Sequence, residues 1–211
     1  MFISFEGLDG SGKTTQANLL VETLKARHHA VDFIREPGGT DISERIREIL
    51  LDKKHLGMNE VTELLLFSAA RAQLVVQTIQ PALKEQRFVV CDRYVDSTMA
   101  YQGYGRGLNL DAVRAINAAA TFGVMPDVTF LIDISVEEII ERRKQSGTPI
   151  DRMESSGKMF YEKVRRGYLA TAKEEPQRFV VVDGAQSIEA IKKIIWEEVE
   201  KRTRKQKAEM K

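Results

Sequence analysis

Hydrophobic residues along the chain gather in five short runs, separated by longer stretches with helical spacing. The runs are rich in β-branched and aromatic side chains, and each has the length of a buried strand. They occupy residues 2–5, 31–34, 88–91, 128–132 and 179–182. Because strands that alternate with helices usually pair in parallel, the pattern predicts an α/β three-layer sandwich, in which helices flank a five-stranded parallel sheet.

The stretches between the runs carry the signals of amphipathic helices. One apolar stripe has the i, i+3, i+4, i+7 spacing of a helix that packs on a sheet, and it comprises Ala17, Leu20, Val21 and Leu24. Ser135 followed by Glu138 predicts a capped helix start, and Ser187 stands just before a stripe of isoleucines. Residues 59–84 contain no glycine and could form one long helix, although Pro81 should kink it or begin a new segment.

The chain length favours a single domain, residues 1–211, because so short a chain cannot build two ordinary cores and a linker. Within this domain, residues 144–157 are polar, contain Gly147 and Pro149, and lie between two helical patterns. We expect this segment to be a mobile lid. The tail at 201–211 carries six Lys or Arg residues against one Glu, and we expect it to be a solvated helix end.

Charge and cysteine content limit the possible partners and location. Lys and Arg number 32 against 31 Asp and Glu, so the chain has no overall field for a nucleic acid polymer or an anionic membrane, and any anion site must be local. The one cysteine, Cys91, lies in an apolar run and cannot form an internal disulfide. No secretion signal opens the sequence, and no run of about 18 apolar residues occurs. We therefore expect a cytoplasmic protein.

The strongest chemical signal is the sequence GLDGSGKT at residues 7–14, between the first predicted strand and the first predicted helix. It fits the pattern G-x-x-x-x-G-K-[ST], whose glycines let successive backbone N–H groups turn toward phosphate oxygens at a helix N-terminus. Lys13 can then reach the β and γ phosphates, and the Thr14 hydroxyl can ligate Mg²⁺. The residues expected to bind ATP are Gly7, Leu8, Asp9, Gly10, Ser11, Gly12, Lys13, Thr14 and Thr15.

A phosphate loop by itself does not say what happens to the nucleotide, because switches, motors and kinases share it. A GTPase switch would usually carry an N-K-x-D guanine reader, and this tetrapeptide does not occur in the sequence. Phosphoryl transfer between two small nucleotides instead needs a second anion site, positive side chains and a lid that excludes water.

Several further motifs could supply these features, and together with the phosphate loop they resemble the thymidylate kinases. They are REPGGT at 35–40, FSAAR at 67–71, DRY at 92–94, STMAYQG at 97–103 and DR at 151–152, in the order and spacing of that family. The resemblance extends from residue 2 to about residue 183. It implies an α/β P-loop fold, ATP with Mg²⁺ as the donor complex, dTMP as the acceptor, and usually a homodimer.

The acceptor site follows from this resemblance and from the chemistry of its residues. Phe67 and Arg71 share a helix face, where a ring can stack on a pyrimidine while a guanidinium donates to its carbonyl. Tyr101 matches a tyrosine that crowds the 2′ position of the sugar. Phe67 and Tyr101 could instead pack in the core, and Arg47 could be a solvated helix charge. The residues expected to bind dTMP are Glu36, Pro37, Arg47, Phe67, Arg71, Arg93, Ser97, Thr98, Tyr101 and Gln102.

Catalysis should depend on positive charge around the transferring phosphoryl group. Thr14 and Asp92 are the expected metal ligands, and Arg93 can clamp phosphate, although Asp92 and Arg93 could also form a structural ion pair. The variable positions of the phosphate loop include no basic residue, which in the family implies a charge supplied by the lid. The candidates for that charge are Arg142, Arg143, Lys144 and Arg152, and the choice stays open. The expected catalytic residues are Asp9, Lys13, Arg93, Arg143 and Arg152.

The sequence thus predicts transfer of the terminal phosphoryl group of ATP to dTMP, without a covalent enzyme intermediate. The acceptor is already an ionised phosphate, so no general base is needed. The lid and the loop at 183–186 would enclose the adenine. Two alternatives stay open: a kinase for another acceptor, such as a deoxynucleoside or a different pyrimidine monophosphate, and a P-loop switch or sensor that transfers no phosphate to a small acceptor.

Overall fold

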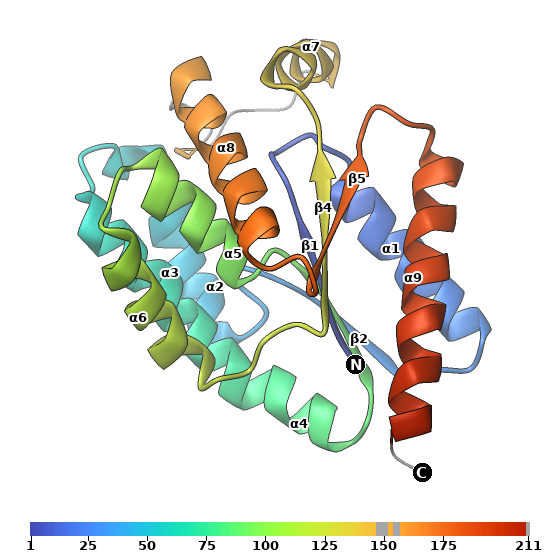
Figure 1. The fold of residues 1–211 in the computed structure, drawn as a ribbon. Coiled ribbons are helices and arrows are strands. Elements are labelled where there is room, and N and C mark those ends of the chain that lie inside the picture. Colours follow the sequence, from blue (N-terminus) through green and yellow to red (C-terminus); the bar gives the residue numbers. More distant parts are fainter. Residues whose placement is uncertain (147–151, 154–156, 210–211) are drawn as a thin grey trace.

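The chain folds around a parallel sheet of five strands, as a computed structural model shows (Figure 1). The structure describes residues 1–146, 152–153 and 157–209, and for residues 143, 145, 146, 207 and 209 it describes only the backbone. The strand order is β2-β3-β1-β4-β5, and neighbouring strands are parallel. The strands are β1 Phe2–Glu6, β2 Val31–Arg35, β3 Phe88–Asp92, β4 Val128–Asp133 and β5 Phe179–Asp183. The predicted sheet is confirmed.

Helices cover both faces of the sheet. They are α1 Lys13–Ala26, α2 Asp41–Leu51, α3 Glu60–Leu74, α4 Gln80–Lys84, α5 Val95–Thr98, α6 Leu110–Thr121, α7 Val136–Ser146, α8 Lys158–Glu174 and α9 Ile188–Glu209. Shorter turns are the 3₁₀ turn η1 Lys53–His55 and the π-helical turns η2 Val75–Ile79 and η3 Met99–Gly105. α1 and α9 lie on one face, α3 to α6 and α8 lie on the other, and α7 lies beyond the strand ends (Figure 1). This arrangement is the predicted three-layer sandwich.

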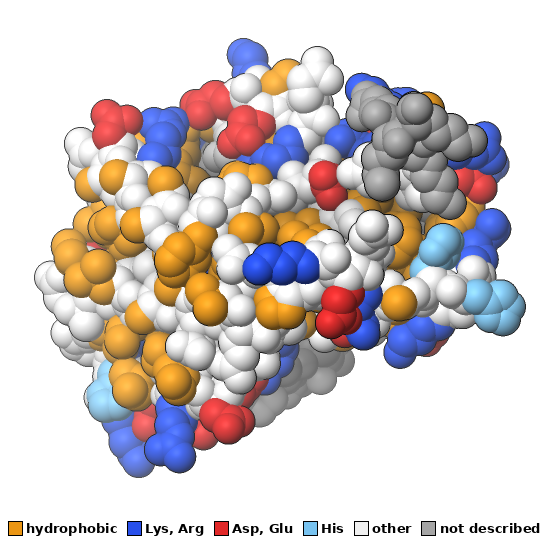
Figure 2. Space-filling view, turned by 90° about the horizontal axis from the view of Figure 1, so that it is seen from below, with side chains coloured by type: hydrophobic (Ala, Val, Ile, Leu, Met, Phe, Trp, Pro, Cys, Tyr) orange, Lys and Arg blue, Asp and Glu red, His pale blue; other side chains and the backbone are white. Residues whose placement is uncertain are grey.

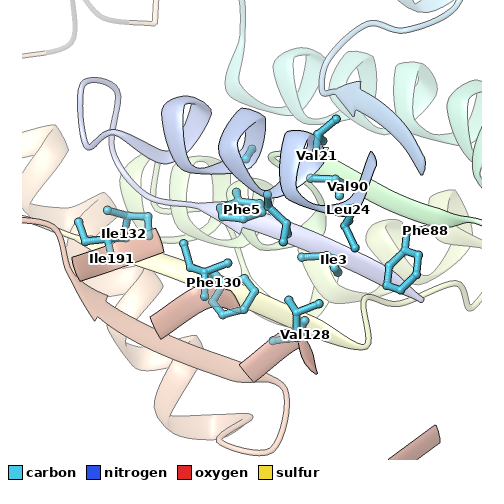
Figure 3. Close-up of a cluster of buried hydrophobic side chains, with 14 of the residues drawn as sticks. Ile3, Phe5, Val21, Leu24, Phe88, Val90, Val128, Phe130, Ile132 and Ile191 are labelled. Carbon is cyan, nitrogen blue, oxygen red and sulfur yellow. The ribbon is translucent and has the colours of Figure 1, made fainter. Parts of the chain in front are cut away.

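The main hydrophobic core lies between the sheet and the helix pair α1 and α9 (Figure 3). Phe5 of β1 and Phe130 of β4 point to this side, and their ring centroids are 5.4 Å apart. Leu24 of α1 and Ile191 of α9 pack into the same buried cluster, whereas Leu131 belongs to the cluster on the opposite face. Because strands buried on both faces need apolar residues at successive positions, the sequence showed continuous rather than alternating hydrophobic runs.

Each strand extends one residue past its predicted apolar run and ends in a charged residue. These last residues are Glu6, Arg35, Asp92, Asp133 and Asp183. The hydrophobic pattern ends before a charged residue, although backbone pairing continues through it, as where Phe5 pairs with Asp92. All these charges lie at the carboxyl edge of the parallel sheet, where open α/β folds bind their ligands.

Residues 60–84 form one continuous helical path through α3, η2 and α4. Asn59 caps its start by accepting a hydrogen bond from the backbone N–H of Val61 at 2.9 Å. In η2 the backbone N–H of Gln80 donates to the carbonyl of Val75, five residues back. A wider turn thus precedes Pro81, whose ring nitrogen has no hydrogen to donate. The long helix is confirmed in outline, and the wider turn accommodates the proline.

The predicted helix starts at Ser135 and Ser187 are confirmed by hydrogen bonds. Ser135 Oγ accepts from the backbone N–H of Glu138 at 3.2 Å, and Ser187 Oγ accepts from that of Ala190 at 3.3 Å. The Glu138 carboxylate accepts from Arg142 at 2.7 Å. The Glu138 carboxylate therefore holds the Arg142 side chain one turn later in α7.

The predicted lid is described in part. α7 carries the chain to Ser146, and Arg152 and Met153 are buried. Residues 147–151 and 154–156 lie outside the described residues, so the mobility of this segment stays a prediction.

The basic tail continues α9 as far as Glu209. Arg204 pairs with Glu200 one turn earlier, and the Arg204 side chain is exposed, as expected of a solvated helix end. Within the part of the chain that the structure describes, no helix is both long and apolar enough to cross a membrane.

Candidate active site

The glycine-rich loop connects β1 to α1 at the carboxyl edge of the sheet. Gly7 and Gly12 have φ values of 140° and 95°, which side chains disfavour, and a Cβ atom on Gly7 would lie 2.5 Å from the carbonyl oxygen of Ile132. Lys13 begins α1 and is buried, with its Nζ 3.5 Å from Asp9 Oδ1. Burial and the nearby Arg93 lower the pKa of Lys13. The loop therefore has the tight backbone that phosphate binding requires.

The two predicted metal ligands meet beside this loop. Thr14 donates its hydroxyl hydrogen to Asp92 Oδ2 at 2.5 Å, which joins α1 to the end of β3. Asp92 Oδ1 is buried and has no hydrogen-bond partner, so it can accept a hydrogen bond from water or coordinate a cation. In the described residues no group of three or more His, Cys, Asp or Glu could hold a metal. Thr14 and Asp92 could hold Mg²⁺ and would leave its other positions to substrate phosphates and water.

Arg93 follows β3 and lies in the left-handed region, with a φ of 72°. Its guanidinium donates to Asp9 Oδ1 at 2.6 Å and to the phenol oxygen of Tyr101 at 3.1 Å. It also donates to Ser97 Oγ at 3.1 Å and to the phenol oxygen of Tyr168 at 2.9 Å. Burial would raise the pKa of Asp9, but Arg93 and Lys13 hold it well below its usual range. The carboxylate of the phosphate loop thus stays ionised and ties Arg93 to that loop.

All the residues predicted to bind dTMP line one cavity, which opens next to Arg93. Asp9, Leu51, Tyr94 and Met153 complete its wall. The predicted residues come from the β2–α2 loop, α2, α3, the end of β3, α5 and the π-helical turn η3. Sequence reasoning therefore selected residues that the fold brings together from distant segments.

Arg71 lies at the back of the cavity in a buried hydrogen-bond network. Its Nε donates to Glu36 Oε2 at 2.8 Å, and its other nitrogens donate to the Asn117 side chain, the Tyr94 carbonyl and Thr98 Oγ1. Burial raises the pKa of Glu36, and the ion pair with Arg71 opposes this rise. Glu36 Oε1 is buried without a partner. One oxygen at the acceptor site is therefore left to accept a hydrogen bond from a ligand or water.

The alternative interpretations of three acceptor residues can be compared with their surroundings. Arg47 donates to the carbonyl of Pro37 at 2.9 Å, so it is tied to the acceptor loop rather than fully solvated. Phe67 is half-buried, packs at the border of a hydrophobic cluster and also lines the cavity. Tyr101 packs in the same cluster and donates its hydroxyl to Asp9 at 3.0 Å. Phe67 and Tyr101 therefore both pack in the hydrophobic cluster and line the cavity.

A buried carboxylate that sequence reasoning missed, Glu63, lies behind Gln102 of the cavity wall. It accepts from Gln102 Nε2 at 2.8 Å and from Arg106 Nε at 3.1 Å. It also pairs with Arg152, whose Nε donates to the Leu50 carbonyl. Burial would raise the pKa of Glu63, but Arg106, Gln102 and Arg152 lower it. Arg152 contacts α2 and α3 here, and its predicted place near the transferring phosphate stays a prediction.

The remaining candidates for the lid charge lie on α7. Arg142 donates to Glu138 and to the carbonyl of Gly184, so it joins α7 to the loop after β5. Lys144 pairs with Glu141 and is exposed. The Arg143 side chain lies outside the described residues. The choice of the lid residue therefore stays open.

Sequence reasoning also missed Glu6 and Tyr168. Glu6 ends β1 and is buried, while Tyr168 lies on α8 and donates to its carboxylate at 2.9 Å. Glu6 precedes the phosphate loop directly, and this position was a usable signal. Tyr168 lies in an ordinary amphipathic helix, where no local signal distinguishes it from a core residue.

A phosphate loop, a Thr–Asp pair beside it and a neighbouring cavity are the features expected of a P-loop nucleotide kinase. Comparisons with known proteins agree, because the family model described as Thymidylate kinase matches residues 5–195. The chain belongs to the thymidylate kinase family. The thymidylate kinase of Caldanaerobacter subterraneus subsp. tengcongensis is 49% identical over 199 residues, which cover 94% of each chain. That of Thermoanaerobacter sp. is 47% identical over 200 residues, 95% of this chain and 97% of the relative.

A solved structure is similar over nearly the whole chain. The crystal structure of thymidylate kinase from Ehrlichia chaffeensis has a TM-score of 0.77 and 37% sequence identity, and the match covers 95% of this chain and 98% of that chain. The family predicted from the motifs is confirmed.

The buried pair of Arg71 and Glu36 leads to a stability prediction. Arg71→Ala should lower the free energy of unfolding by about 3–5 kcal/mol, because it leaves a buried carboxylate without its partner. The matched control is Arg35→Ala, which breaks an exposed pair with Glu44 and should cost about 1 kcal/mol or less. Urea unfolding measures both variants. Equal losses of unfolding free energy in the two variants would contradict the prediction that the buried ion pair is more costly to break than the exposed one.

Proposed function

We infer that this protein transfers the terminal phosphoryl group of ATP to dTMP with Mg²⁺, producing ADP and dTDP for dTTP biosynthesis. One observation carries the inference: Arg93 is bound to Asp9 of the phosphate loop and at the same time lines the acceptor cavity. Donor and acceptor phosphates would thus meet on the two sides of one guanidinium. Direct in-line transfer between them needs neither a covalent intermediate nor a general base.

On the donor side, the backbone N–H groups of residues 7–15 hold the phosphates of ATP, and Lys13 neutralises their charge. Thr14 would hold Mg²⁺ directly, and Asp92 would hold it directly or through water. The ion would supply positive charge beside the phosphates. Arg93, with Arg143 or another basic residue of the lid, stabilises the charge that spreads over the moving group. Asp9 positions Arg93 through their ion pair.

On the acceptor side, Phe67 stacks on the thymine ring, and Arg47 is near the acceptor phosphate. Thr98 and Gln102 offer a hydroxyl and an amide to the base, and both are buried at the cavity wall. Tyr101 crowds the 2′ position of the sugar. The remaining wall is formed by Glu36, Pro37, Arg71 and Ser97.

The partners and location follow from the same proposal. Small nucleotides are the partners, and the near-balanced charge of the chain gives no support to binding of nucleic acid polymers. We propose a cytoplasmic location, which the single buried thiol of Cys91 supports.

A coupled ADP-release assay tests the reaction. With ATP and Mg²⁺, dTMP should give the fastest release among dTMP, dUMP, UMP, CMP, AMP, GMP and thymidine, because Phe67, Arg71 and Gln102 of the cavity wall suit a thymine ring. Release should disappear without Mg²⁺. Activity with a different acceptor would leave the phosphate machinery in place but reject the assigned base pocket. Binding of ATP without product from any acceptor would favour a nucleotide sensor.

Arg93→Ala tests the proposed centre of the reaction. The variant should lose turnover by at least about 10³-fold, the scale of an arginine that stabilises the transferring group. Binding of ATP, measured by calorimetry, should change little because the phosphate loop stays intact. The control is Arg114→Ala, which removes an exposed ion pair on α6 and should keep normal turnover. Normal turnover of Arg93→Ala would remove this residue from the mechanism.

We also propose that the protein is a homodimer, as the family resemblance implies. Val61, Leu65 and Ala69 follow one another four residues apart along α3, and all three are exposed. Val76 in η2 is 50% exposed as well. Figure 2 shows hydrophobic side chains gathered on the left-hand side of the molecule, where α3 and α6 lie in Figure 1. An apolar helix face of this kind supports pairing with a second copy.

Light scattering tests the dimer. The native chain should have twice the monomer mass, and Leu65→Glu should shift it toward the monomer because it places a charge in an apolar interface. Ile188→Glu is the control, since Ile188 is equally exposed at the start of α9 and should leave the dimer intact. A monomeric mass for the native chain at working concentration would refute the proposal.

A further inference from the structure

Glu6 is a fully buried carboxylate at the end of β1, beside the phosphate loop. It accepts four hydrogen bonds, two on each oxygen. Oε1 accepts from the backbone N–H of Tyr94 at 2.6 Å and from Ser4 Oγ at 3.2 Å. Oε2 accepts from Ser97 Oγ at 2.6 Å and from the phenol of Tyr168 at 2.9 Å. No step of the reaction described above uses this carboxylate, although Ser97, which donates to it, lines the cavity.

The two hydroxyls on Oε2 are also the acceptors that hold Arg93. Arg93 Nη1 donates to Ser97 Oγ at 3.1 Å and to Tyr168 at 2.9 Å, and the two hydroxyl oxygens lie 2.8 Å apart. A guanidinium can only donate, and an ionised carboxylate can only accept. The hydroxyl hydrogens must therefore point toward Glu6, directly or through each other, and their lone pairs must point toward Arg93.

We propose that Glu6 is a positioning residue for Arg93, because it sets the direction in which the Ser97 and Tyr168 hydroxyls donate. The inference rests on the proposed role of Arg93 in phosphoryl transfer. Arg93 has a strained left-handed backbone and carries a long side chain, so its guanidinium depends on fixed acceptors. Asp9 and Tyr101 accept hydrogen bonds from Nη2 on the side of the phosphate loop. The Ser97 and Tyr168 hydroxyls, which Glu6 orients, accept from Nη1 on the opposite side.

The substitution Glu6→Gln has a specific consequence in this geometry. The Tyr94 N–H needs an acceptor at the Oε1 position, so the new amide must keep its carbonyl oxygen there. Its NH₂ group then occupies the Oε2 position and donates to the hydroxyls. One hydroxyl can donate to the other, but the remaining hydrogen must turn toward Arg93, where donor faces donor. A change of nearly identical shape thus removes at least one of the acceptors of Arg93.

Protonation of Glu6 should act in the same way as this substitution. Burial and the charge of Asp96 raise the pKa of Glu6 to about 7, although Arg93 and the hydrogen bonds from Ser97 and Tyr94 oppose the rise. As pH falls through that value, the carboxyl gains a hydrogen and can donate to a hydroxyl, and turnover should fall. The charged or titratable groups around Glu6 are Lys13, Arg71, Cys91, Arg93, Tyr94, Asp96 and Tyr168.

The test compares Glu6→Gln with Ser4→Ala, which removes a partner of Oε1 that does not contact Arg93. Glu6→Gln should lower kcat on the order of 10- to 100-fold, the range typical of groups that orient a charged site. Its KM for ATP should stay near that of the native chain, and its pH profile should lose the acidic limb near 7. Ser4→Ala should keep the native kcat and profile. A native kcat and pH profile in Glu6→Gln would overturn the proposal.

Two further variants keep the outcome decisive. If Glu6→Gln does not fold, as judged by circular dichroism, Tyr168→Phe replaces it, because this variant removes one acceptor of Arg93 and leaves the carboxylate. Its kcat should fall several-fold, and an unchanged kcat would reject the inference. Arg93→Ala separates the two proposals: if it is inactive while Glu6→Gln is fully active, only the positioning role fails. If Arg93→Ala is active, the proposed centre of the reaction fails first.

Discussion

The ion pair between Arg93 and Asp9 joins the two halves of the site, and much of the surrounding structure serves to hold it. A buried guanidinium is costly unless charged or polar acceptors surround it, and Arg93 has such an acceptor on each side. Asp9 comes from the phosphate loop, Ser97 and Tyr101 come from the adjoining segments α5 and η3, and Tyr168 comes from α8. Satisfying one charge therefore brings three parts of the chain into a single fixed arrangement.

The parallel sheet makes this convergence possible. Its strands all end at the same edge, so the charged residues that terminate β1 and β3 come close together although they are far apart in sequence. Two buried carboxylates near the cavity have similar surroundings. Glu36 forms an ion pair with Arg71, and Glu63 accepts hydrogen bonds or ion pairs from Gln102, Arg106 and Arg152. Each orients groups at the cavity wall. Such networks favour a unique geometry because a partly satisfied buried charge is unfavourable.

Local sequence signals predicted the sheet, the phosphate loop and the acceptor residues. The strands appeared as apolar runs, and only their charged last residues, such as Glu6 and Asp92, were missed. The acceptor residues carried the motifs of a known family, and one cavity contains them all. Glu63 and Tyr168 could not be found in this way, because each resembles an ordinary residue of an amphipathic helix. Arg152 was selected as a possible phosphate clamp by residue type, and its ion pair with the buried Glu63 could not be predicted from the sequence.

The sequence by itself determined the elements, the position of the phosphate loop and the family, because these depend on spacing and residue type within short segments. Only the tertiary structure decided which side chains share a hydrogen-bond network. The bond between Glu6 and Tyr168 joins residues 162 positions apart, and Gln102 meets Glu63 across 39 positions. Such contacts depend on how helices pack on the sheet. No pattern along a single segment specifies the donor that a buried carboxylate will meet.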